Sequence, residues 1–347
     1  MMQPTLPAAA YWDPAIFRKE RERIFFKSWT LFGPESDVAE PGTWRADTVN
    51  GWPIFVARGE DRRLRAFHNV CRHRGAALLT GETGKCRLVV CPYHAWSYDL
   101  AGALVRVPNF GEDAAFDKAS HGLFPVRVAT WAGLIFICLD KAAPDLMSWL
   151  GAIPKLAEGY PDATAMALEG KITVEGACNW KAYCDNTVEG YHLPSVHKRL
   201  NAAIDRDNTS IVSHDGGRLV VFDVTYASDG STLRGAKGVW FYRFPGFQGV
   251  LGRFVDAGPL GKGKADRIEP ITPSRMRYTN WSWYRDLTPE ARLDSQEWSR
   301  QIAAEDIGVC ETVQTNMEAG IYSTGVLSPL QEGHIARLQE LVREAMA

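Results

Sequence analysis

The sequence lacks an excess of charge of either sign: its 39 Lys and Arg and 41 Asp and Glu leave a formal net charge of −2 over 347 residues. Such a balance gives no electrostatic reason to expect a nucleic acid or an anionic membrane as a partner. No apolar run reaches the length of about 20 residues that a transmembrane helix needs. The first residues also lack a charged segment followed by an apolar one, so no secretory signal is expected. These absences predict a cytoplasmic protein that binds neither nucleic acid nor membrane.

Cysteine and histidine are scarce, with seven and eight residues. An odd number of cysteines in a chain expected to stay in a reducing compartment argues against a disulfide framework. We find no internal repeat and no low-complexity tract. The length allows two domains, and a hydrophobic content of 46% is ordinary for a globular protein. Because they are few, we consider the role of the cysteine and histidine residues individually.

Turn residues and apolar spacing divide the chain into three parts. Asp13-Pro14 is a typical helix start, and residues 1–37 are expected to form an N-terminal helix that packs on the last domain. Residues 38–152 contain short runs separated by Gly, Asn and Asp, which predicts a compact all-β domain. Residues 153–347 alternate strand-like and helical segments, with helices expected over 289–316 and 334–346. The predicted fold class is α+β.

Four of the scarce residues stand in two mixed pairs, Cys71 with His73 and Cys91 with His94. Zinc also takes two thiolates and two imidazoles, but usually from pairs of like residues. A Rieske [2Fe–2S] centre places two thiolates on one iron and two imidazoles on the other. Two loops that each give one Cys and one His suit it, because each loop then spans both irons. The spacing favours a Rieske cluster over zinc.

A second set of candidate ligands lies in the segment EGYHLPSVH. His192 and His197 are five residues apart, which is about 140° around an unbroken helix and poor geometry for a shared metal. A break at Pro194 would bring His197 back towards His192. Two imidazoles and one carboxylate form the facial triad of non-haem Fe(II) oxygenases, which leaves positions open for O2. The carboxylate is expected from the later helix as Asp306, with Glu305 and Glu311 as alternatives.

Taken together, these motifs resemble the oxygenase components (α subunits) of Rieske non-haem iron oxygenases over nearly the whole chain. The matching motifs are C-R-H-R-G (71–75), C-P-Y-H-A-W (91–96), N-W-K (179–181), E-G-Y-H-L-P-S-V-H (189–197) and E-D-I-G-V-C-E-T-V-Q (305–314). The resemblance implies an all-β Rieske [2Fe–2S] domain and a helix-grip catalytic domain with a curved antiparallel sheet. It implies that the cluster is held by Cys71, His73, Cys91 and His94, and mononuclear Fe(II) by His192, His197 and Asp306.

Two further residues are assigned as catalytic candidates, Glu189 and Asn186. Glu189 precedes His192 by three residues, which places both on one face of a helix. The resemblance implies that Glu189 is a bridging carboxylate between a cluster histidine of one subunit and an iron histidine of the next, in a head-to-tail homotrimer. Many relatives carry Asp there. Glu189 and the C-D-N stretch at 184–186 are more similar to the branch that acts on quaternary ammonium compounds such as carnitine and choline.

The function implied is that of a terminal oxygenase in a multicomponent system. An NAD(P)H-dependent reductase, directly or through a ferredoxin, would supply electrons for O2-dependent hydroxylation of a small amine or quaternary ammonium compound. N- or O-dealkylation would follow where the hydroxylated carbon carries nitrogen or oxygen. The alternatives are an aromatic-ring dioxygenase of aromatic hydrocarbon catabolism and an N-dealkylase of an aromatic xenobiotic, and a β subunit is left open. A Rieske electron carrier without catalytic iron and a zinc-stabilised binding protein are the competing classes.

The second domain is also rich in aromatic residues and carries two candidate anion-binding arginines. Aromatic side chains can build a cage for a quaternary ammonium group, but alternating aromatic residues in strands more often form core. Arg243 or Arg253 would hold a substrate carboxylate if they are more than exposed strand charges. The aromatic candidates are Trp240, Phe241, Tyr242, Phe244, Phe247, Trp281, Trp283 and Tyr284.

Overall fold

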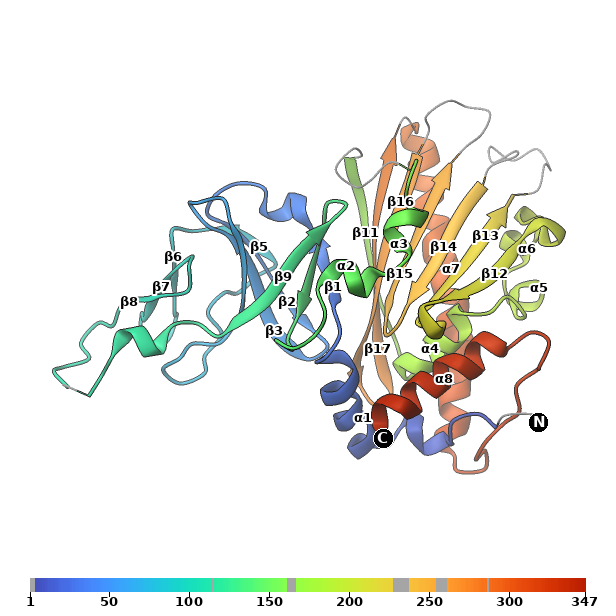
Figure 1. The fold of residues 1–347 in the computed structure, drawn as a ribbon, viewed down its shortest axis with the longest axis horizontal. Helices are drawn as coiled ribbons and strands as arrows, with labels where there is room; N and C mark the ends of the chain where they lie inside the picture. Colours follow the sequence, from blue (N-terminus) through green and yellow to red (C-terminus); the bar gives the residue numbers. More distant parts are fainter. Residues whose placement is uncertain (1–3, 114, 161–166, 227–236, 254–260, 286) are drawn as a thin grey trace. The chain divides into compact units, whose positions relative to one another are not determined.

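The computed structural model describes residues 4–113, 115–160, 167–226, 237–253, 261–285 and 287–347 (Figure 1). The chain divides into a smaller unit, Lys27–Leu146, and a larger unit made of Met1–Phe26 and Met147–Ala347. These boundaries differ from the ones expected after residues 37 and 152. The first moves because β1 (Thr30–Pro34) pairs with β10 (Leu134–Cys138), so the residues after 26 belong to the β structure.

The smaller unit contains a seven-stranded and a three-stranded antiparallel sheet. The larger of these sheets has the order β1-β10-β9-β4-β3-β2-β5, and the other has the order β6-β7-β8. The remaining strands are β2 (Thr43–Val49), β3 (Trp52–Arg58), β4 (Leu64–His68), β5 (Thr83–Lys85), β6 (Leu88–Val90), β7 (Ser97–Asp99), β8 (Leu104–Arg106) and β9 (Pro125–Trp131).

Strand β3 connects two separate cores of the smaller unit. Successive side chains of a strand point to opposite faces of the sheet. Ile54 and Val56 pack into one apolar cluster with strands β1 and β10, while Phe55 and Ala57 pack into another. All four are fully buried. The second apolar group also contains Cys71 and Cys91, so the two cysteines predicted to bind the [2Fe–2S] centre are part of the core.

The larger unit is built on a seven-stranded antiparallel sheet with the order β11-β17-β16-β15-β14-β13-β12. Its strands are β11 (Ala167–Gly176), β12 (Ser210–His214), β13 (Leu219–Thr225), β14 (Lys237–Arg243), β15 (Phe247–Arg253), β16 (Gly261–Thr272) and β17 (Arg275–Arg285). The helices are α1 (Pro14–Glu20), α3 (Ile153–Leu156), α4 (Trp180–Thr187), α5 (Leu193–Val196), α6 (Lys198–Ala203), α7 (Pro289–Glu318) and α8 (Gly333–Met346), and α2 (Leu146–Leu150) begins at the boundary.

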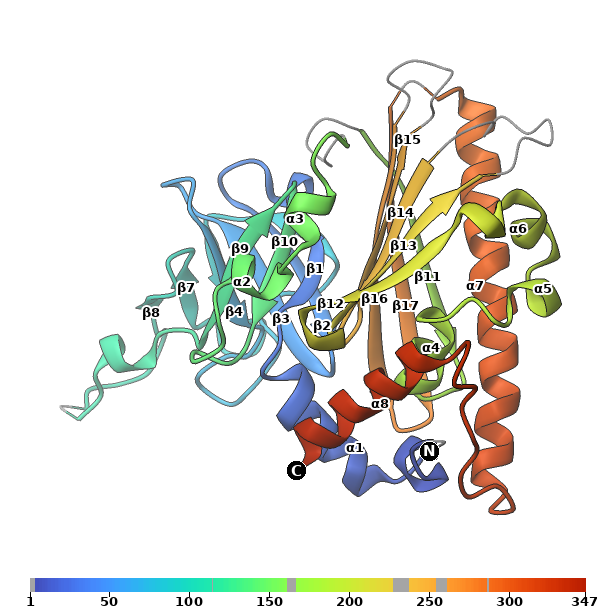
Figure 2. The same cartoon turned by 45° about the vertical axis from the view of Figure 1, so that its right-hand side comes forward.

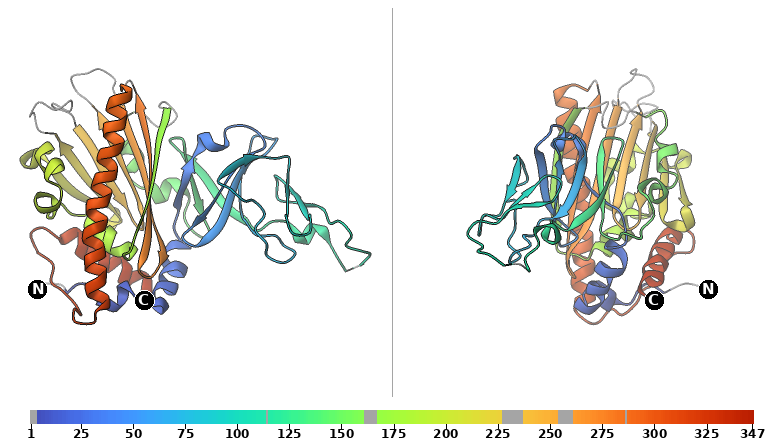
Figure 3. Two further views of the ribbon diagram at one scale, coloured as in Figure 1. Left: turned by 180° about the vertical axis from the view of Figure 1, so that it is seen from behind. Right: turned by 60° about the vertical axis from the view of Figure 1, so that its left-hand side comes forward.

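The 30-residue helix α7 lies along one face of this sheet (Figures 2 and 3). It begins where the Thr288 side chain accepts the N–H of Ala291 at 3.3 Å and Pro289 occupies the first turn. Its buried residues recur at a spacing of three or four, which is the inward stripe of a helix that packs on one side. A long helix held by a curved antiparallel sheet confirms the predicted helix-grip α+β fold. No helix among the described residues is long and apolar enough to cross a membrane.

The first residues of the chain pack against α4 through a buried ion pair. Glu20 is fully buried, and its carboxylate lies 2.7 Å from Lys181 Nζ and accepts from Trp180 Nε1 at 2.9 Å. Lys181 Nζ also donates to Asn179 Oδ1 at 2.7 Å. Burial lowers the pKa of Lys181, and the charge of Glu20 opposes that shift. The pair therefore fastens the N-terminal segment to the start of α4.

Candidate metal centres and substrate cavity

Two loops of the smaller unit carry the predicted cluster ligands, and their backbones are built alike. In each, the cysteine N–H donates to the carbonyl five residues on, and the cysteine carbonyl accepts from the N–H four residues on. The distances are 2.8 and 3.0 Å in both loops, with Ala76 and Gly75 for Cys71, and with Trp96 and Ala95 for Cys91. Gly75 and Ala95 have φ of 75° and 56°, the left-handed turn that closes each loop.

In these two loops the cysteine side chains are buried together and the histidine side chains are exposed together. Cys71 and Cys91 are both 2% exposed and contact each other, whereas His73 and His94 are exposed with ring centroids 4.7 Å apart. Burial raises the pKa of Cys91, and the N–H groups of Tyr93 and His94 oppose that shift by donating to its sulfur. Thiol thus meets thiol and imidazole meets imidazole, so the donor set fits a Rieske [2Fe–2S] centre.

The histidines of the larger unit come from a chain segment that is interrupted twice. Helix α4 ends at Thr187, the single turn α5 contains Pro194, and His197 sits between α5 and α6 with φ −109° and ψ 71°. The expected break before Pro194 is present, because the proline begins the short turn α5, and the second bend at His197 was not predicted. Glu189 is not on a helix either, and its carboxylate accepts the backbone N–H groups of Tyr191 and His192.

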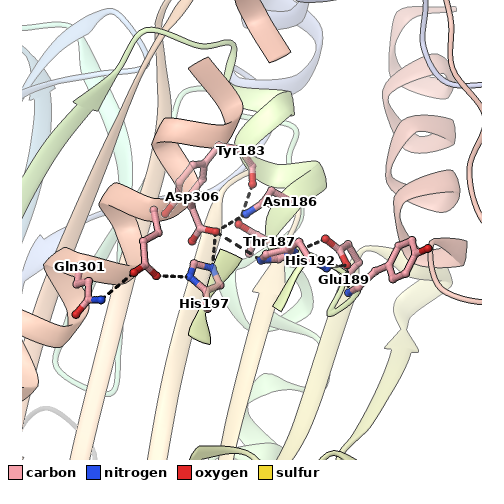
Figure 4. Close-up of polar contacts among 10 residues, drawn as sticks. Tyr183, Asn186, Thr187, Glu189, His192, His197, Gln301 and Asp306 are labelled. Carbon is pink, nitrogen blue, oxygen red and sulfur yellow. Dashed lines mark hydrogen bonds and ion pairs between the residues drawn. The ribbon is translucent and has the colours of Figure 1, made fainter. Parts of the chain in front are cut away.

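These bends bring together the three residues predicted to bind Fe(II) (Figure 4). One possible ligand atom from each of His192, His197 and Asp306 lies within 4.8 Å of the others. Asp306 Oδ1 is 2.8 Å from His197 Nε2 and 3.6 Å from His192 Nε2. The second set therefore fits a metal centre of two imidazoles and one carboxylate. Of the rival carboxylates, Glu311 lies elsewhere and accepts the N–H of Ala177 at 2.8 Å.

In His192 and His197, the ring nitrogen that points away from Asp306 contacts a second carboxylate. Glu189 contacts Nδ1 of His192, and Glu305 Oε2 lies 2.6 Å from Nδ1 of His197. Gln301 in turn donates to Glu305 at 2.8 Å (Figure 4). Carboxylates in this position fix the orientation and tautomer of a metal-binding imidazole. Glu305, a rival ligand in the sequence, thus faces the nitrogen that points away from Asp306.

The carboxylates also dominate the protonation of the site. Burial lowers the pKa of His192, but hydrogen bonds and charge from Asp306 and Glu189 outweigh it and raise that pKa to about 9. The pKa of His197 is raised in the same way by Asp306 and Glu305. Burial raises the pKa of Asp306, but the two histidines lower it below its ordinary value. Asn186 adds a hydrogen bond from Nδ2 to Asp306 Oδ1 at 2.6 Å.

Beside these three residues the larger unit contains a partly open cavity of about 190 Å³ between the sheet and α7. Three of the predicted aromatic residues line it, Trp240, Phe241 and Tyr242. The other five, Phe244, Phe247, Trp281, Trp283 and Tyr284, are buried core. Further aromatic walls come from residues that the sequence did not single out: Tyr183, Phe222, Tyr226, Tyr278 and Trp298.

Charged residues of the cavity also differ from the expected ones. Arg243 forms an ion pair with Asp215 at 2.8 Å away from the cavity lining, and the side chain of Arg253 lies outside the described residues. Lys264 and Asp266 on β16 line the cavity instead. Burial raises the pKa of Asp266 to about 6, although Asn280 and Lys264 oppose the shift. Sequence reasoning missed both residues because β16 has no apolar alternation.

Comparison with known sequence families matches most of the chain. Residues 28–129 match the Rieske [2Fe-2S] domain, and residues 164–236 and 264–347 match the catalytic domain of the ring hydroxylating alpha subunit. The chain is 36% identical over 332 residues to a carnitine monooxygenase oxygenase subunit of Escherichia coli K12, covering 92% of this chain and 85% of that protein. It is 29% identical over 345 residues to the chloroplastic choline monooxygenase of Beta vulgaris, covering 95% and 74%.

Solved structures with the same fold include one with a bound substrate. The quaternary ammonium Rieske monooxygenase CntA in complex with L-carnitine superposes with a TM-score of 0.84 at 27% identity, covering 100% of this chain and 96% of that one. A naphthalene 1,2-dioxygenase from Rhodococcus sp. superposes with a TM-score of 0.80 at 22% identity, covering 99% and 94%, which is a likeness of fold.

Proposed function

Because this chain belongs to the Rieske oxygenase family as an oxygenase α subunit, we propose that it is a monooxygenase that hydroxylates a quaternary ammonium compound at a carbon next to nitrogen. The observation that carries the proposal is the aromatic cavity that borders His192, His197 and Asp306. Aromatic faces attract a desolvated cation, and a quaternary ammonium group cannot use hydrogen bonds instead. The cavity therefore suits this class of substrate.

We assign the [2Fe–2S] cluster to Cys71, His73, Cys91 and His94, and mononuclear Fe(II) to His192, His197 and Asp306. When bound, these groups would supply the electron and the O2 chemistry of the family. The protein's own side chains hold the ligands in place. Glu189 and Glu305 orient the two imidazoles, and Asn186 holds the Asp306 carboxylate through its amide. We propose Asn186 as a positioning residue for that reason.

The electron supply and the assembly belong to the same proposal. We propose an NAD(P)H-dependent reductase, with or without a ferredoxin, as the electron donor and a homotrimer as the working unit. Inter-subunit electron transfer is described for the quaternary ammonium Rieske monooxygenase that this chain resembles. The exposed imidazole of His94 supports this assignment, because it is open to a partner. Glu189 would then serve as the bridge between subunits as well as the support of His192.

An aromatic hydrocarbon is the alternative substrate. The likeness to naphthalene 1,2-dioxygenase lies in the fold. Lys264 and Asp266 place ionic side chains in the lining of the cavity, and such a lining favours a polar or charged substrate over a hydrocarbon.

Iron analysis and turnover together test the proposal. We expect iron-supplemented protein to contain a Rieske cluster with about one further iron per chain, and His192→Ala to lose that iron while the EPR signal of the reduced cluster stays. With a reductase and O2, the wild type should consume γ-butyrobetaine or choline and release an amine or formaldehyde. Oxidation of naphthalene without consumption of either ammonium compound would contradict the proposal.

A further inference from the structure

An acidic residue on α4, Asp185, stands next to Asn186 but lies outside the cavity lining. Its Oδ2 accepts the hydroxyl proton of Tyr11 at 2.7 Å and an N–H of Gln339 at 2.9 Å. Consecutive side chains of a helix point about 100° apart, so Asn186 can face the metal site while Asp185 faces elsewhere. Gln339 lies on α8, and its amide oxygen accepts the N–H of Leu6 at 2.7 Å. Asp185 therefore connects α4 to segments from both ends of the chain.

Tyr11 is also held by α7, the helix that supplies the carboxylate of the metal site. Its backbone carbonyl accepts from Gln314 Nε2 at 3.1 Å, and the amide oxygen of Gln314 accepts the N–H of Asn179 at 2.9 Å. Asn179 is the N-cap of α4, so one glutamine fixes both the start of that helix and the tyrosine that holds Asp185. A second link thus joins α4 to α7, besides the hydrogen bond that Asn186 donates to the carboxylate (Figure 4).

The surroundings of Asp185 are unfavourable for a charge. Burial raises its pKa to about 6, although the hydrogen bonds from Tyr11 and Gln339 oppose the shift. Lys181, one turn earlier on α4, also lowers that pKa, but its ammonium lies 2.7 Å from the Glu20 carboxylate. A desolvated carboxylate weakens a fold unless its charge has a strong partner. An acid in this position is therefore explained better by a role in the metal site than by stability.

We propose that Asp185 is a positioning residue of the metal site: it fixes α4 so that the Asn186 amide meets the Asp306 carboxylate. A charge-assisted hydrogen bond holds its donor more firmly than a neutral one, which suits an acid in this position. Without the bonds to Tyr11 and Gln339, α4 would be free to shift against α7, and the amide would no longer hold one orientation of the carboxylate. The inference rests on the proposed function, because it assigns a support to the same metal site.

Equilibrium dialysis with Co(II) tests this role in protein that keeps its Rieske cluster and has lost the mononuclear metal. Cobalt is counted separately from the iron of the cluster. We expect Asp185→Ala to raise the Kd for Co(II) roughly 3-fold to 30-fold, as for residues that act on a site through others. Asp185→Asn should keep most of the affinity, because an amide oxygen can accept both hydrogen bonds. The matched control is Leu338→Ala, which removes a buried side chain beside Gln339: the thermal midpoint should fall while the Kd stays unchanged.

A double-variant cycle shows whether Asp185 acts through Asn186. We expect Asp185→Ala to change the Kd by less than about 2-fold in a chain that already carries Asn186→Ala, because the amide to be positioned is gone. Two effects that multiply in full would overturn the inference, as would an Asp185→Ala variant with the wild-type Kd or an equal loss in Leu338→Ala. If Asp185→Ala does not fold, Tyr11→Phe interrupts the same link at its donor and takes its place in the cycle.

Failure of the proposed function gives a different result. A wild type that binds no more Co(II) than His192→Ala contradicts the assigned metal ligands, and this inference falls with them. A wild type that binds Co(II) but oxidises no ammonium compound contradicts the proposed substrate, while the dialysis results on Asp185 still decide its positioning role.

Discussion

At the scale of single residues, His192 and His197 both direct Nε2 to Asp306 but differ in the carboxylate that contacts Nδ1. Glu305 comes from α7, is itself held by Gln301, and orients His197. Glu189 comes from an irregular segment and also accepts backbone N–H groups. A carboxylate that only orients an imidazole and one that also connects subunits would look the same within one chain. The two residues therefore form a natural pair for comparison.

Replacing each carboxylate in turn separates these roles. We expect Glu189→Ala to keep both metal centres in iron-supplemented protein while turnover falls further than in Glu305→Ala, by roughly 100-fold or more, because the proposed bridge is lost together with the support of His192. Glu305→Ala should weaken iron binding and lower turnover by about 10-fold to 100-fold, the usual cost of losing the partner of a metal-bound histidine. Iron content, the EPR spectrum and turnover of both variants provide the measurement. Equal losses in the two would show that Glu189 acts only by orienting His192.

At this scale the sequence identified candidate ligands but not the lining of the cavity. Cys71, His73, Cys91 and His94 could be singled out as candidates because scarce residue types stand in close pairs. The sequence did not single out Lys264 and Asp266, or the supporting role of Glu305. Each is a charged residue in a segment whose composition is typical of an exposed surface. Only the pairing of β16 with its neighbours and the packing of α7 turn those side chains inwards.

At the scale of elements, the start of α4 depends on a charge pair that it shares with the N-terminal segment. Removing one partner of a buried ion pair leaves the other charge desolvated and unpaired. We expect Lys181→Met to lower the free energy of unfolding by about 3–5 kcal/mol. The double variant Glu20→Gln, Lys181→Met should recover more than half of that loss, since the amide oxygen still accepts from Trp180. Urea unfolding followed by far-UV circular dichroism measures both, and a single-variant loss below about 1 kcal/mol would contradict the expectation.

Element prediction succeeded where the pattern was long and regular. The helix expected over 289–316 is α7, and the one expected over 334–346 is α8. The segment from Glu189 to His197 was harder, because its shape follows from side-chain bonds to the backbone and from a single turn at Pro194. Local hydrophobic spacing carries no information on such bonds.

At the scale of the whole molecule, the smaller unit is one continuous stretch with its own two cores. We expect residues 27–146 to fold alone and to bind the [2Fe–2S] cluster, because both ligand loops are anchored in one of those cores. The absorption and EPR spectra of the separately expressed unit, reconstituted with iron and sulfide, are the measurement. A product that stays colourless, or that binds zinc alone, would contradict this expectation.

The boundary of this unit could not be placed from composition, because β1 pairs with a strand about 100 residues later and local turn signals do not reveal such a partner.

The larger unit is discontinuous: its first 26 residues are separated from the remainder by the whole smaller unit. This order has a consequence for synthesis on the ribosome. Residues 147–347 are translated after the smaller unit, which takes roughly 10–40 s at rates of about 5–20 residues per second. During this time Glu20 of the N-terminal segment has no Lys181 to pair with, because α4 has not yet been synthesised. This order would allow the [2Fe–2S] centre to be loaded into a finished module before the catalytic unit exists.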